Sequence, residues 1–428
     1  MNLNKPVKNN KDFISLAKEL FPINRSLTGP GNLKTLKILK KQSSILKIKS
    51  VNTGYKCFDW KVPLEWSVND AYIIDPDGKK ICDLKENNLH LVGYSTKFFG
   101  KLKYNQLIKK LHYLKDKPDA IPYVTSYYKK NWGFCISYNK FKKLKKRGYY
   151  KIFIDSKLKK GKMLYAEGLV KGKSKKEILI TSYICHPSMA NNELSGPLVL
   201  TKLANLLKPG KFTIRLLLIP ETIGAIFYIK KNFKNLKKNL ISGINLSCVG
   251  DNGPYTIIST LNNNTYIDLI ANRILNKRKN TFKYSYDYRG SNERQFGCQN
   301  LNFPFITFCR SRFMDYPEYH TSDDNLKIIS NKNLLQSLKF IIDIIKEIQS
   351  NRQFRKKIIC EPFLTKYKLI NTTSKSGNNY NNLVSKILPY INTNYDMKFL
   401  QEKFSLNKKK INLIINLLKK NKIIEEII

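Results

Sequence analysis

Strand-like apolar runs alternate with segments of helical length between residues 177 and 350, and this alternation limits the possible folds more than any other feature. The strand-like runs lie at 177–185, 212–219, 241–249 and 303–309, and the helical segments at 196–207, 223–232, 266–276 and 334–350. Strands that are apolar on both faces are typical of parallel sheets covered by helices on both sides. We therefore predict an α/β fold with a mostly parallel sheet and helices on both faces.

Polar residues with catalytic or metal-binding chemistry follow three consecutive strands of this predicted sheet. His186 and Glu193 come after the first run, Glu221 after the second and Asp251 after the third, while His320 lies in a further polar segment among carboxylates. In open α/β sheets, ligands collect outside the carboxyl ends of the strands. Because neutral imidazole is a common ligand for transition metals, we predict a shared metal or catalytic site formed by these residues.

Each of these residues also has a structural explanation. A histidine at the end of a strand is commonly a hydrogen-bonded structural residue. Glu221 and Asp251 precede helices or turns, where carboxylates often act as caps. The recurrence after three consecutive strands, with His320 as a fourth member, favours the shared site.

A small β-rich module interrupts the helical pattern between residues 51 and 119, where short β-like runs are separated by turn residues. We predict that its Trp60, Trp66 and Tyr72 are core residues, with a stacking platform for carbohydrate or peptide as the alternative. Arg25 precedes this module, between two predicted helices. Its guanidinium suits a carboxylate or an anionic substrate group, held by a bidentate pair, with turn geometry and a surface charge as the alternative.

The C-terminal part of the chain has a different pattern. A polar linker at 371–379 precedes three short amphipathic segments at 383–391, 397–404 and 408–420. Their order resembles a winged helix, in which Lys408, Lys409 and Lys410 would face nucleic acid. We favour a docking or structural module, because lysine is equally frequent elsewhere in the chain.

The chain is strongly basic, since 78 Lys and Arg against 31 Asp and Glu give a formal net charge of +47. Such a charge ordinarily suggests a polyanionic partner such as nucleic acid. The lysines are, however, spread from Lys5 to Lys422, which indicates a generally basic surface. We therefore predict no nucleic-acid partner and keep such contact as the minority alternative.

The cysteines and the apolar runs bear on the compartment. The 8 cysteines show no CxxC spacing, which favours reduced, structural thiols. No stretch reaches the apolar length that spans a bilayer, and residues 1–10 are polar and basic with no apolar region after them. We expect a cytoplasmic protein without membrane contact, and a homo-oligomer is compatible with the sequence.

Six short motifs occur in order along the chain. They are Asn-Arg-Ser-Leu-Thr-Gly at 24–29, Phe-Asp-Trp-Lys-Val-Pro at 58–63, Tyr-Ile-Cys-His-Pro-Ser at 183–188, Pro-Glu-Thr-Ile-Gly at 220–224, Arg-Gly-Ser-Asn-Glu-Arg at 289–294 and Glu-Tyr-His-Thr-Ser at 318–322. Together they resemble the aminopeptidase-like proteins of bacterial polysaccharide-biosynthesis gene clusters, which are related in fold to the zinc aminopeptidases. The resemblance implies an aminopeptidase-like α/β domain at 1–48 and 119–352, an inserted β-rich domain at 49–118, and a linker and winged-helix domain at 353–428.

The same resemblance implies roles for individual residues. His186 and His320 match metal-binding histidines of the zinc aminopeptidases, Glu221 matches their general base, and Asp251 lies near a metal-binding aspartate. The implied cofactor is zinc, as one ion or two.

Two positions depart from the pattern of the zinc aminopeptidases. Asn192 stands where they have a bridging aspartate, with Glu193 beside it, and Thr222 stands where a metal-binding glutamate follows the base. A ligand that bridges two dications should be anionic. Either Glu193 takes over this role, or a single zinc is held by His186, His320 and a carboxylate.

The activity implied by the resemblance is zinc-dependent hydrolysis of an amide, with Glu221 accepting the proton of a zinc-bound water. The expected substrate is a small peptide-like molecule or an amino-acylated or N-acylated sugar in surface-polysaccharide biosynthesis. Arg289, Glu293 and Arg294 are candidates for recognising its terminal charges, with an internal salt-bridge cluster as the alternative.

Two other classes of function remain open. Asn192 and Thr222 support a catalytically reduced, metal-stabilised binding or scaffold protein, although the presence of Glu221 argues against it. A nucleic-acid-binding regulator acting through the winged helix is the weaker alternative.

Overall fold

The computed structural model describes residues 11–369, 379–392 and 394–427, and the chain divides into two compact units. The first unit comprises Met1–Leu261 and Arg278–Ile342, and the second comprises Asn262–Lys277 and Asp343–Ile428. Most of the predicted linker at 371–379 lies outside the described residues. In the described segments, no helix combines the length and the apolar composition needed to cross a bilayer.

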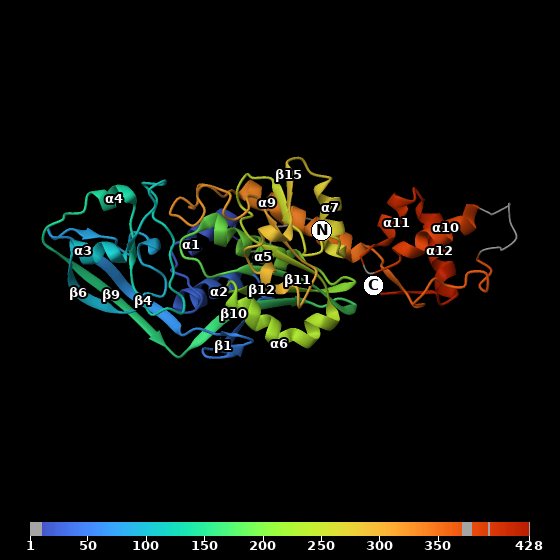
Figure 1. The fold of residues 1–428 in the computed structure, drawn as a ribbon, viewed down its shortest axis with the longest axis horizontal. Helices are drawn as coiled ribbons and strands as arrows, with labels where there is room; N and C mark the ends of the chain where they lie inside the picture. The colour runs from blue at the N-terminus through green and yellow to red at the C-terminus, as the bar shows by residue number, and fades with distance from the viewer. Residues whose placement is uncertain (1–10, 370–378, 393, 428) are drawn as a thin grey trace. The chain divides into compact units, whose positions relative to one another are not determined.

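An eight-stranded sheet forms the centre of the first unit, in the order β1-β10-β12-β11-β13-β16-β14-β15 (Figure 1). The strands are β1 (Lys47–Asn52), β10 (Lys162–Val170), β11 (Ser174–Tyr183), β12 (Phe212–Ile219), β13 (Leu240–Leu246), β14 (Tyr255–Ile258), β15 (Thr281–Tyr284) and β16 (Phe305–Cys309). The four central strands, β12, β11, β13 and β16, run parallel, whereas β1, β10 and β14 add antiparallel pairs. The predicted α/β class with a mostly parallel sheet is confirmed.

Helices cover both faces of this sheet. Successive side chains of a strand point to opposite sides, so one strand can contact a helix on each face. Leu179 of β11 belongs to the same apolar cluster as Ile226 of α6 (Ile223–Asn239). Ser182 lies on the other face, where a Cβ on Gly196 of α5 (Ser195–Leu206) would collide with its hydroxyl. Figure 1 shows α5 and α6 on these two sides.

Further helices of this unit lie outside its β-rich part. They are α1 (Phe13–Leu20), α2 (Pro30–Gln42), α8 (Glu293–Phe296) and the first part of α9 (Asn331–Ser350). The helix predicted to end at residue 232 continues as α6 to Asn239. Asn232 has non-helical torsion angles, φ −111° and ψ 15°, so the predicted end marks a kink inside a longer helix.

A second, four-stranded sheet forms the β-rich part of the first unit, in the order β5-β4-β9-β6. The elements here are β2 (Lys56–Cys57), β3 (Trp60–Lys61), β4 (Glu65–Ile74), β5 (Lys80–Ile81), β6 (Phe98–Lys103), α3 (Tyr104–Leu107), β7 (Leu111–His112), β8 (Phe134–Cys135), α4 (Tyr138–Lys142) and β9 (Tyr149–Lys159). Strand β9 pairs with both β4 and β6. The predicted limit of the inserted domain at residue 118 therefore excludes a central strand of its sheet, because the pairing partner lies far along the chain.

The second unit is mainly helical and contains the three helices predicted near the C-terminus. Its elements are α7 (Tyr266–Leu275), the end of α9, β17 (Phe354–Lys356), α10 (Asn379–Ile387), α11 (Met397–Lys403), α12 (Lys408–Lys420) and β18 (Ile424–Glu426). Strands β17 and β18 pair antiparallel. Inside this unit Arg273 of α7 binds Asp396 through two hydrogen bonds of 3.0 Å, which ties α7 to the start of α11.

Candidate active site

The carboxyl ends of β11, β12 and β13 meet at one edge of the main sheet. In the parallel register Tyr183 of β11 pairs with Ile219 of β12, and Thr181 pairs with Asn245 of β13. The segments that follow the three strands therefore begin side by side. His186 lies in the segment after β11, and Glu221 lies in the segment after β12. Parallel strands bring their following loops together in this way, which is why residues distant in sequence form one site.

His186 is buried and held on its backbone and ring by Glu193. One oxygen of Glu193 accepts the backbone N–H groups of Cys185, at 2.7 Å, and of His186, and lies 3.1 Å from His186 Nδ1. Burial alone would lower the pKa of His186, but its contacts with Cys185 and Glu193 reverse this and raise the pKa. The Nε2 atom is left facing Glu221, whose Oε2 lies 3.9 Å away.

Arg25 occupies the other oxygen of Glu193. Its Nε donates to Glu193 Oε1 at 2.6 Å and to the carbonyl of His186 at 3.1 Å, and its Nη1 donates to the carbonyl of Leu20 at 2.6 Å. Both side chains of the ion pair are fully buried. Of the two predicted partners of Arg25, a carboxylate or an anionic substrate group, the structure thus shows a carboxylate, that of Glu193.

The contacts of Glu193 with Arg25 and His186 also bear on the prediction that Glu193 binds a metal. Cys185, His186 and Glu193 offer ligand atoms within 4.8 Å of one another, which is close enough for a metal. However, a guanidinium in contact with Glu193 repels a cation and already neutralises the carboxylate. Glu193 is therefore better described as the residue that orients His186.

His320 lies next to His186, and Tyr123 stands against both rings. The ring centroids of the two histidines are 5.4 Å apart, and each is 5.1 Å from that of Tyr123. His320 also stacks on Tyr319 at 3.9 Å. Burial, with a smaller repulsion from His186, lowers the pKa of His320 to about 3, so its imidazole is neutral. Its Nε2 is buried without a hydrogen-bond partner among the described residues.

Glu221 lies at the start of α6, with its side chain 19% exposed. Its Oε1 accepts a hydrogen bond of 2.6 Å from Ser291. Burial raises the pKa of Glu221, against the opposing charge of His186, which is the direction that favours a general base. The next residue, Thr222, has φ 62° and ψ −82°, an unusual backbone conformation of the kind that clusters at functional sites.

Asp324 is a buried carboxylate that the sequence analysis did not select. It accepts the backbone N–H groups of Ala190, Asn191 and Asn192 at 3.1, 2.6 and 2.8 Å, and the hydroxyl of Tyr316 at 2.9 Å. It thereby holds the π-helical turn Ala190–Leu194 that carries Asn192 and Glu193. Burial nevertheless raises the pKa of Asp324 to about 6.

This shift gives a testable dependence of stability on pH. Folded Asp324 keeps its proton up to about pH 6, whereas the unfolded carboxyl loses it near its ordinary value of 3.8. The folded state therefore binds more protons between these values, and the free energy of unfolding should fall by about 2 to 3 kcal/mol as pH rises through this window. Urea denaturation of the wild type and Asp324→Asn at pH 4, 5 and 6 checks this.

The comparison isolates Asp324, because the other titrating groups are common to both proteins. The difference in unfolding free energy between them should change with pH. Equal slopes in the two proteins would show that Asp324 is ionised in the folded state throughout the window.

Asp251 does not reach the histidines through any contact of the described residues. It instead accepts hydrogen bonds from the backbone of Gly253 at 2.6 Å, from the Ser311 hydroxyl at 3.1 Å and from the Asn191 amide. Its role as a metal ligand is not supported, because these donors close the loop after β13. The residue immediately after β13 is Ser247, whose hydroxyl lies 2.6 Å from that of Tyr183.

The three residues predicted to recognise substrate charges have different environments. Glu293 is fully buried and accepts the backbone N–H groups of Gly290 and Ser291 at 2.7 and 3.0 Å. Arg289 lies against the ring of Tyr286, 4.8 Å from its centroid. Both contacts are local and structural. Arg289 and Arg294 are both exposed, but of the three residues only Arg294 lines the cavity beside Glu221, and its guanidinium donates to Thr222 Oγ1 at 2.7 Å.

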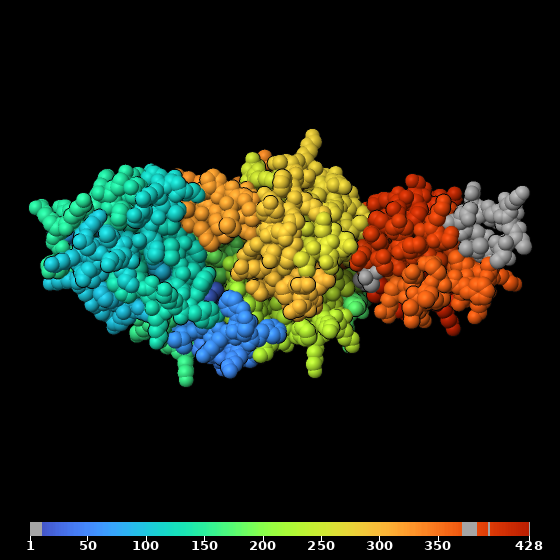
Figure 2. All heavy atoms as spheres, in the orientation of Figure 1, coloured from blue at the N-terminus to red at the C-terminus, as the bar shows by residue number. Residues whose placement is uncertain are grey.

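A cavity of about 210 Å³ opens next to Glu221. Its lining comprises Leu27, Trp60, Tyr127, Tyr128, Glu221, Thr222, Ile223 and Arg294. Trp60 comes from the β2–β3 hairpin, which contacts α6, and Figure 2 shows the blue atoms of this region beside the yellow-green atoms of α6. The prediction that Trp60 is a core residue is wrong, since it is 38% exposed, whereas Trp66 is buried against Tyr94 as predicted.

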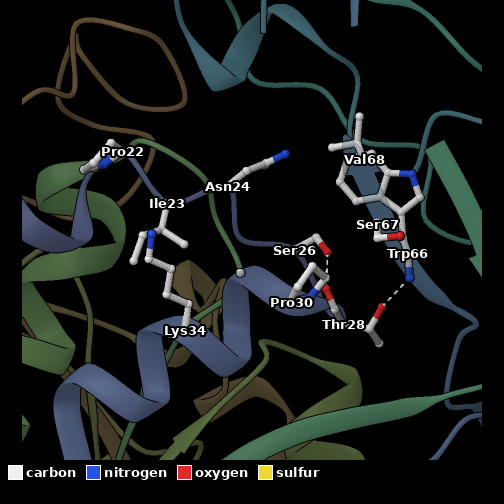
Figure 3. Close-up of a pocket in the computed structure, with 11 residues that line it drawn as sticks. Pro22, Ile23, Asn24, Ser26, Thr28, Pro30, Lys34, Trp66, Ser67 and Val68 are labelled. Carbon is white, nitrogen blue, oxygen red and sulfur yellow. Dashed lines mark hydrogen bonds between the residues drawn. The ribbon is translucent and has the colours of Figure 1, made fainter. Parts of the chain in front are cut away.

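A larger cavity of about 270 Å³ lies between the loop before α2 and strand β4 (Figure 3). Among its lining residues are Asn24, Ser26, Thr28, Lys34 and Trp66. Ser26 and Thr28 are hydrogen-bonded within this loop and to β4. Lys34 is its single titratable residue, so the larger cavity lacks the groups for acid–base chemistry, and the smaller one beside Glu221 is the candidate active site.

The fold and this cluster of two histidines and a glutamate at the strand ends define an aminopeptidase-like α/β protein. The chain belongs to the family described as Domain of unknown function (DUF4910), which matches residues 14–351.

Known proteins support this class. A Clostridium acetobutylicum protein, named as a candidate polysaccharide biosynthesis protein with an aminopeptidase-like domain, is 39% identical over 373 residues, covering 85% of each chain. The crystal structure of a candidate peptidase from C. acetobutylicum aligns with a TM-score of 0.79 and 34% identity, covering 97% of this chain and 96% of that chain. A zinc aminopeptidase from Bacillus subtilis aligns with a TM-score of 0.58 and 14% identity, covering 80% and 96%. At this identity the last likeness concerns the fold alone.

The side chains present fit one metal ion better than two. The Nε2 of His320 and the Oδ1 of Asn192 are buried and lack hydrogen-bond partners among the described residues. The ring centroids of His186 and His320 lie 5.4 Å apart, with the ring planes tilted by 44°, so the two imidazoles are neighbours in one buried site. An anionic bridge for a second ion is missing, because Asn192 is neutral and Glu193 is bound to Arg25.

Proposed function

We propose that this protein is a zinc-dependent, aminopeptidase-like amide hydrolase with a single metal ion. The observation that carries the proposal is the buried, unpartnered Nε2 of His320 beside His186, with the carboxylate of Glu221 3.9 Å from His186 Nε2. His186 and His320 would hold the ion, and Asn192 stands where the zinc aminopeptidases have a bridging aspartate. When bound, zinc polarises the scissile carbonyl and acidifies water.

The other steps belong to side chains of this chain. Glu221 accepts the proton of the attacking water and passes it to the leaving nitrogen. Ser291 holds one oxygen of Glu221 at 2.6 Å, which leaves the other free for the proton. Glu193 fixes the backbone and Nδ1 of His186, and Arg25 fixes Glu193. Such supporting contacts set the orientation of a ligand histidine.

The name of the C. acetobutylicum relative suggests the setting of the reaction. We infer a substrate in surface-polysaccharide biosynthesis that carries an amino-acyl or N-acyl group, handled in the cytoplasm. The order of α10, α11, α12 and the β17–β18 pair supports a winged helix in the second unit. Its proposed role is docking.

A second candidate function is a metal-stabilised binding protein that has lost hydrolysis. It is favoured by the neutral residues Asn192 and Thr222 and by the neutralised Glu193. A site with fewer anionic ligands holds zinc less tightly. Retention of Glu221 next to an open cavity favours the hydrolase.

Metal content is the first test. Elemental analysis after zinc loading is expected to give about one zinc per chain in the wild type, and to lose it in His186→Ala and in His320→Ala. The exposed His112 provides the matched control, because His112→Ala should keep the metal. Asn192→Asp should raise zinc retention, since it adds an anionic ligand.

Folded wild-type protein without zinc after loading would refute the hydrolase. Zinc that persists in both histidine variants would place the metal elsewhere. One bound zinc without turnover of any acyl or aminoacyl amide would favour the binding protein.

A further inference from the structure

The lining of the cavity beside Glu221 includes aromatic side chains and Arg294, which amide hydrolysis by itself does not require. We propose that it binds a sugar ring bearing a carboxylate, so that the substrate of this site is an acidic saccharide carrying the scissile amide. This inference rests on the proposed hydrolase and names its substrate class.

Large aromatic faces line this cavity and are exposed to solvent. Trp60, Tyr127 and Tyr128 are 38%, 39% and 49% exposed. The rings of Trp60 and Tyr128 contact each other edge-on at 6.1 Å, and the hydroxyl of Tyr128 donates to the carbonyl of Lys61 at 2.6 Å. These contacts fix the aromatic walls before any ligand arrives, which lowers the entropy lost on binding.

An open aromatic wall suits a sugar better than an apolar side chain. The C–H face of a pyranose packs against the electron-rich face of an aromatic ring while its hydroxyls stay in water. A pocket for an apolar side chain instead encloses most of the ligand surface. The exposed fractions of Trp60 and Tyr128 therefore favour one-sided stacking of a ring.

The charge of the cavity selects for an acidic group. Arg294 makes no ion pair with the described residues, and its bond to Thr222 leaves other N–H groups of the guanidinium available. A guanidinium matches a carboxylate with two parallel hydrogen bonds. Glu221 is the single carboxylate of the lining and is assigned to proton transfer. A positively charged group of a substrate would be repelled by Arg294 and would find no carboxylate other than Glu221 in the lining.

A neighbouring cavity extends the same surface. It has a volume of about 100 Å³, shares Tyr127 and Tyr128 with the first, and includes Lys129 and Lys130. The backbone of Tyr127, with φ 44°, is held in the left-handed region between the two cavities. The basic residues continue the preference for anions away from Glu221, so a saccharide longer than one residue can follow this surface.

Binding measurements with a matched pair of sugars test the inference. The full-length Glu221→Gln protein, which removes turnover, is titrated by calorimetry with N-acetylglucosaminuronic acid and with N-acetylglucosamine, which differ in one carboxylate. The acid is expected to bind about tenfold tighter, as one charge-assisted contact provides. Adding Arg294→Ala should abolish this difference and leave the neutral sugar unchanged.

A second variant tests the aromatic side chains that line the cavity. Adding Trp60→Ala should weaken both sugars by about three- to tenfold, the range of one aromatic contact. The exposed Arg147 and Phe99 supply controls, because Arg147→Ala removes a guanidinium and Phe99→Ala an exposed aromatic ring outside the cavity. Equal affinity for the acidic and neutral sugars would overturn the inference. Tighter binding of N-acetylphenylalanine, lost in Trp60→Ala, would overturn it in favour of a peptide side chain.

The inference and the proposed function fail separately. Selective sugar binding without hydrolysis of any amide would remove the hydrolase and leave the saccharide site. Hydrolysis of amides with no preference for acidic sugars would remove the saccharide site alone.

Discussion

Replacing Arg25 by alanine is expected to lower the free energy of unfolding of the first unit by about 3 to 5 kcal/mol, because the change leaves the buried carboxylate of Glu193 without its cation. Both side chains of the pair are fully buried. The variant also removes the hydrogen bonds of Arg25 to the carbonyls of Leu20 and His186.

The measurement is urea denaturation followed by tryptophan fluorescence. The 3 tryptophans, Trp60, Trp66 and Trp132, all belong to the first unit, so the signal reports this unit. The matched control is Lys11→Ala, which breaks the exposed ion pair with Glu19 and should cost about 0.5 kcal/mol or less. The double variant Arg25→Met with Glu193→Gln should recover part of the loss, because no charge is then left buried.

A small effect of Arg25→Ala would contradict the assigned role. It would mean that Glu193 takes a proton or finds water when the guanidinium is absent. In that case the orientation of His186 would not depend on the ion pair.

The second large effect is expected at Glu221. Glu221→Gln should lower kcat/KM for an amide substrate by about 10²- to 10⁴-fold, because glutamine cannot accept the proton of the attacking water. Zinc content should stay unchanged, since His186 and His320 remain. Because burial raises the pKa of Glu221, the acid limb of the wild-type activity profile should lie above the ordinary value of 4.5 and disappear from the residual activity.

The control removes an equivalent carboxylate outside the site. Glu86 is exposed and takes no part in the cavity, so Glu86→Gln should keep wild-type kinetics. Unchanged turnover in Glu221→Gln would exclude Glu221 as the base. Loss of zinc in this variant would assign Glu221 to the metal instead.

The parallel strands β11, β12, β13 and β16 were predictable because their signal is local, whereas β1, β14 and β15 were not predicted. Strand β12 has the predicted bounds, Phe212–Ile219, since a run of apolar residues is enough to specify a strand buried on both faces. Helix α12 likewise matches its predicted span, Lys408–Lys420. The inserted sheet was harder, because β9 joins strands from much earlier in the chain.

The candidate site was predictable in part. Rules for strand ends identified His186 and Glu221, and the carboxylates around His320 added it to them. The same rules could not separate Asp251, which closes a loop, from Asp324, which holds the turn carrying Asn192. Both are acidic residues in polar segments, and only the donors around each one distinguish them.

By itself, the sequence determined the alternation of strands and helices and therefore the edge of the sheet where polar residues collect. The tertiary structure decided which of these residues work together. Arg25 and Glu193 are 168 positions apart, and Trp60 reaches the cavity of Glu221 and Arg294 from the β-rich part of the unit. Patterns of hydrophobicity act over a few residues, whereas an ion pair or a pocket wall depends on how distant segments pack, which no local pattern specifies.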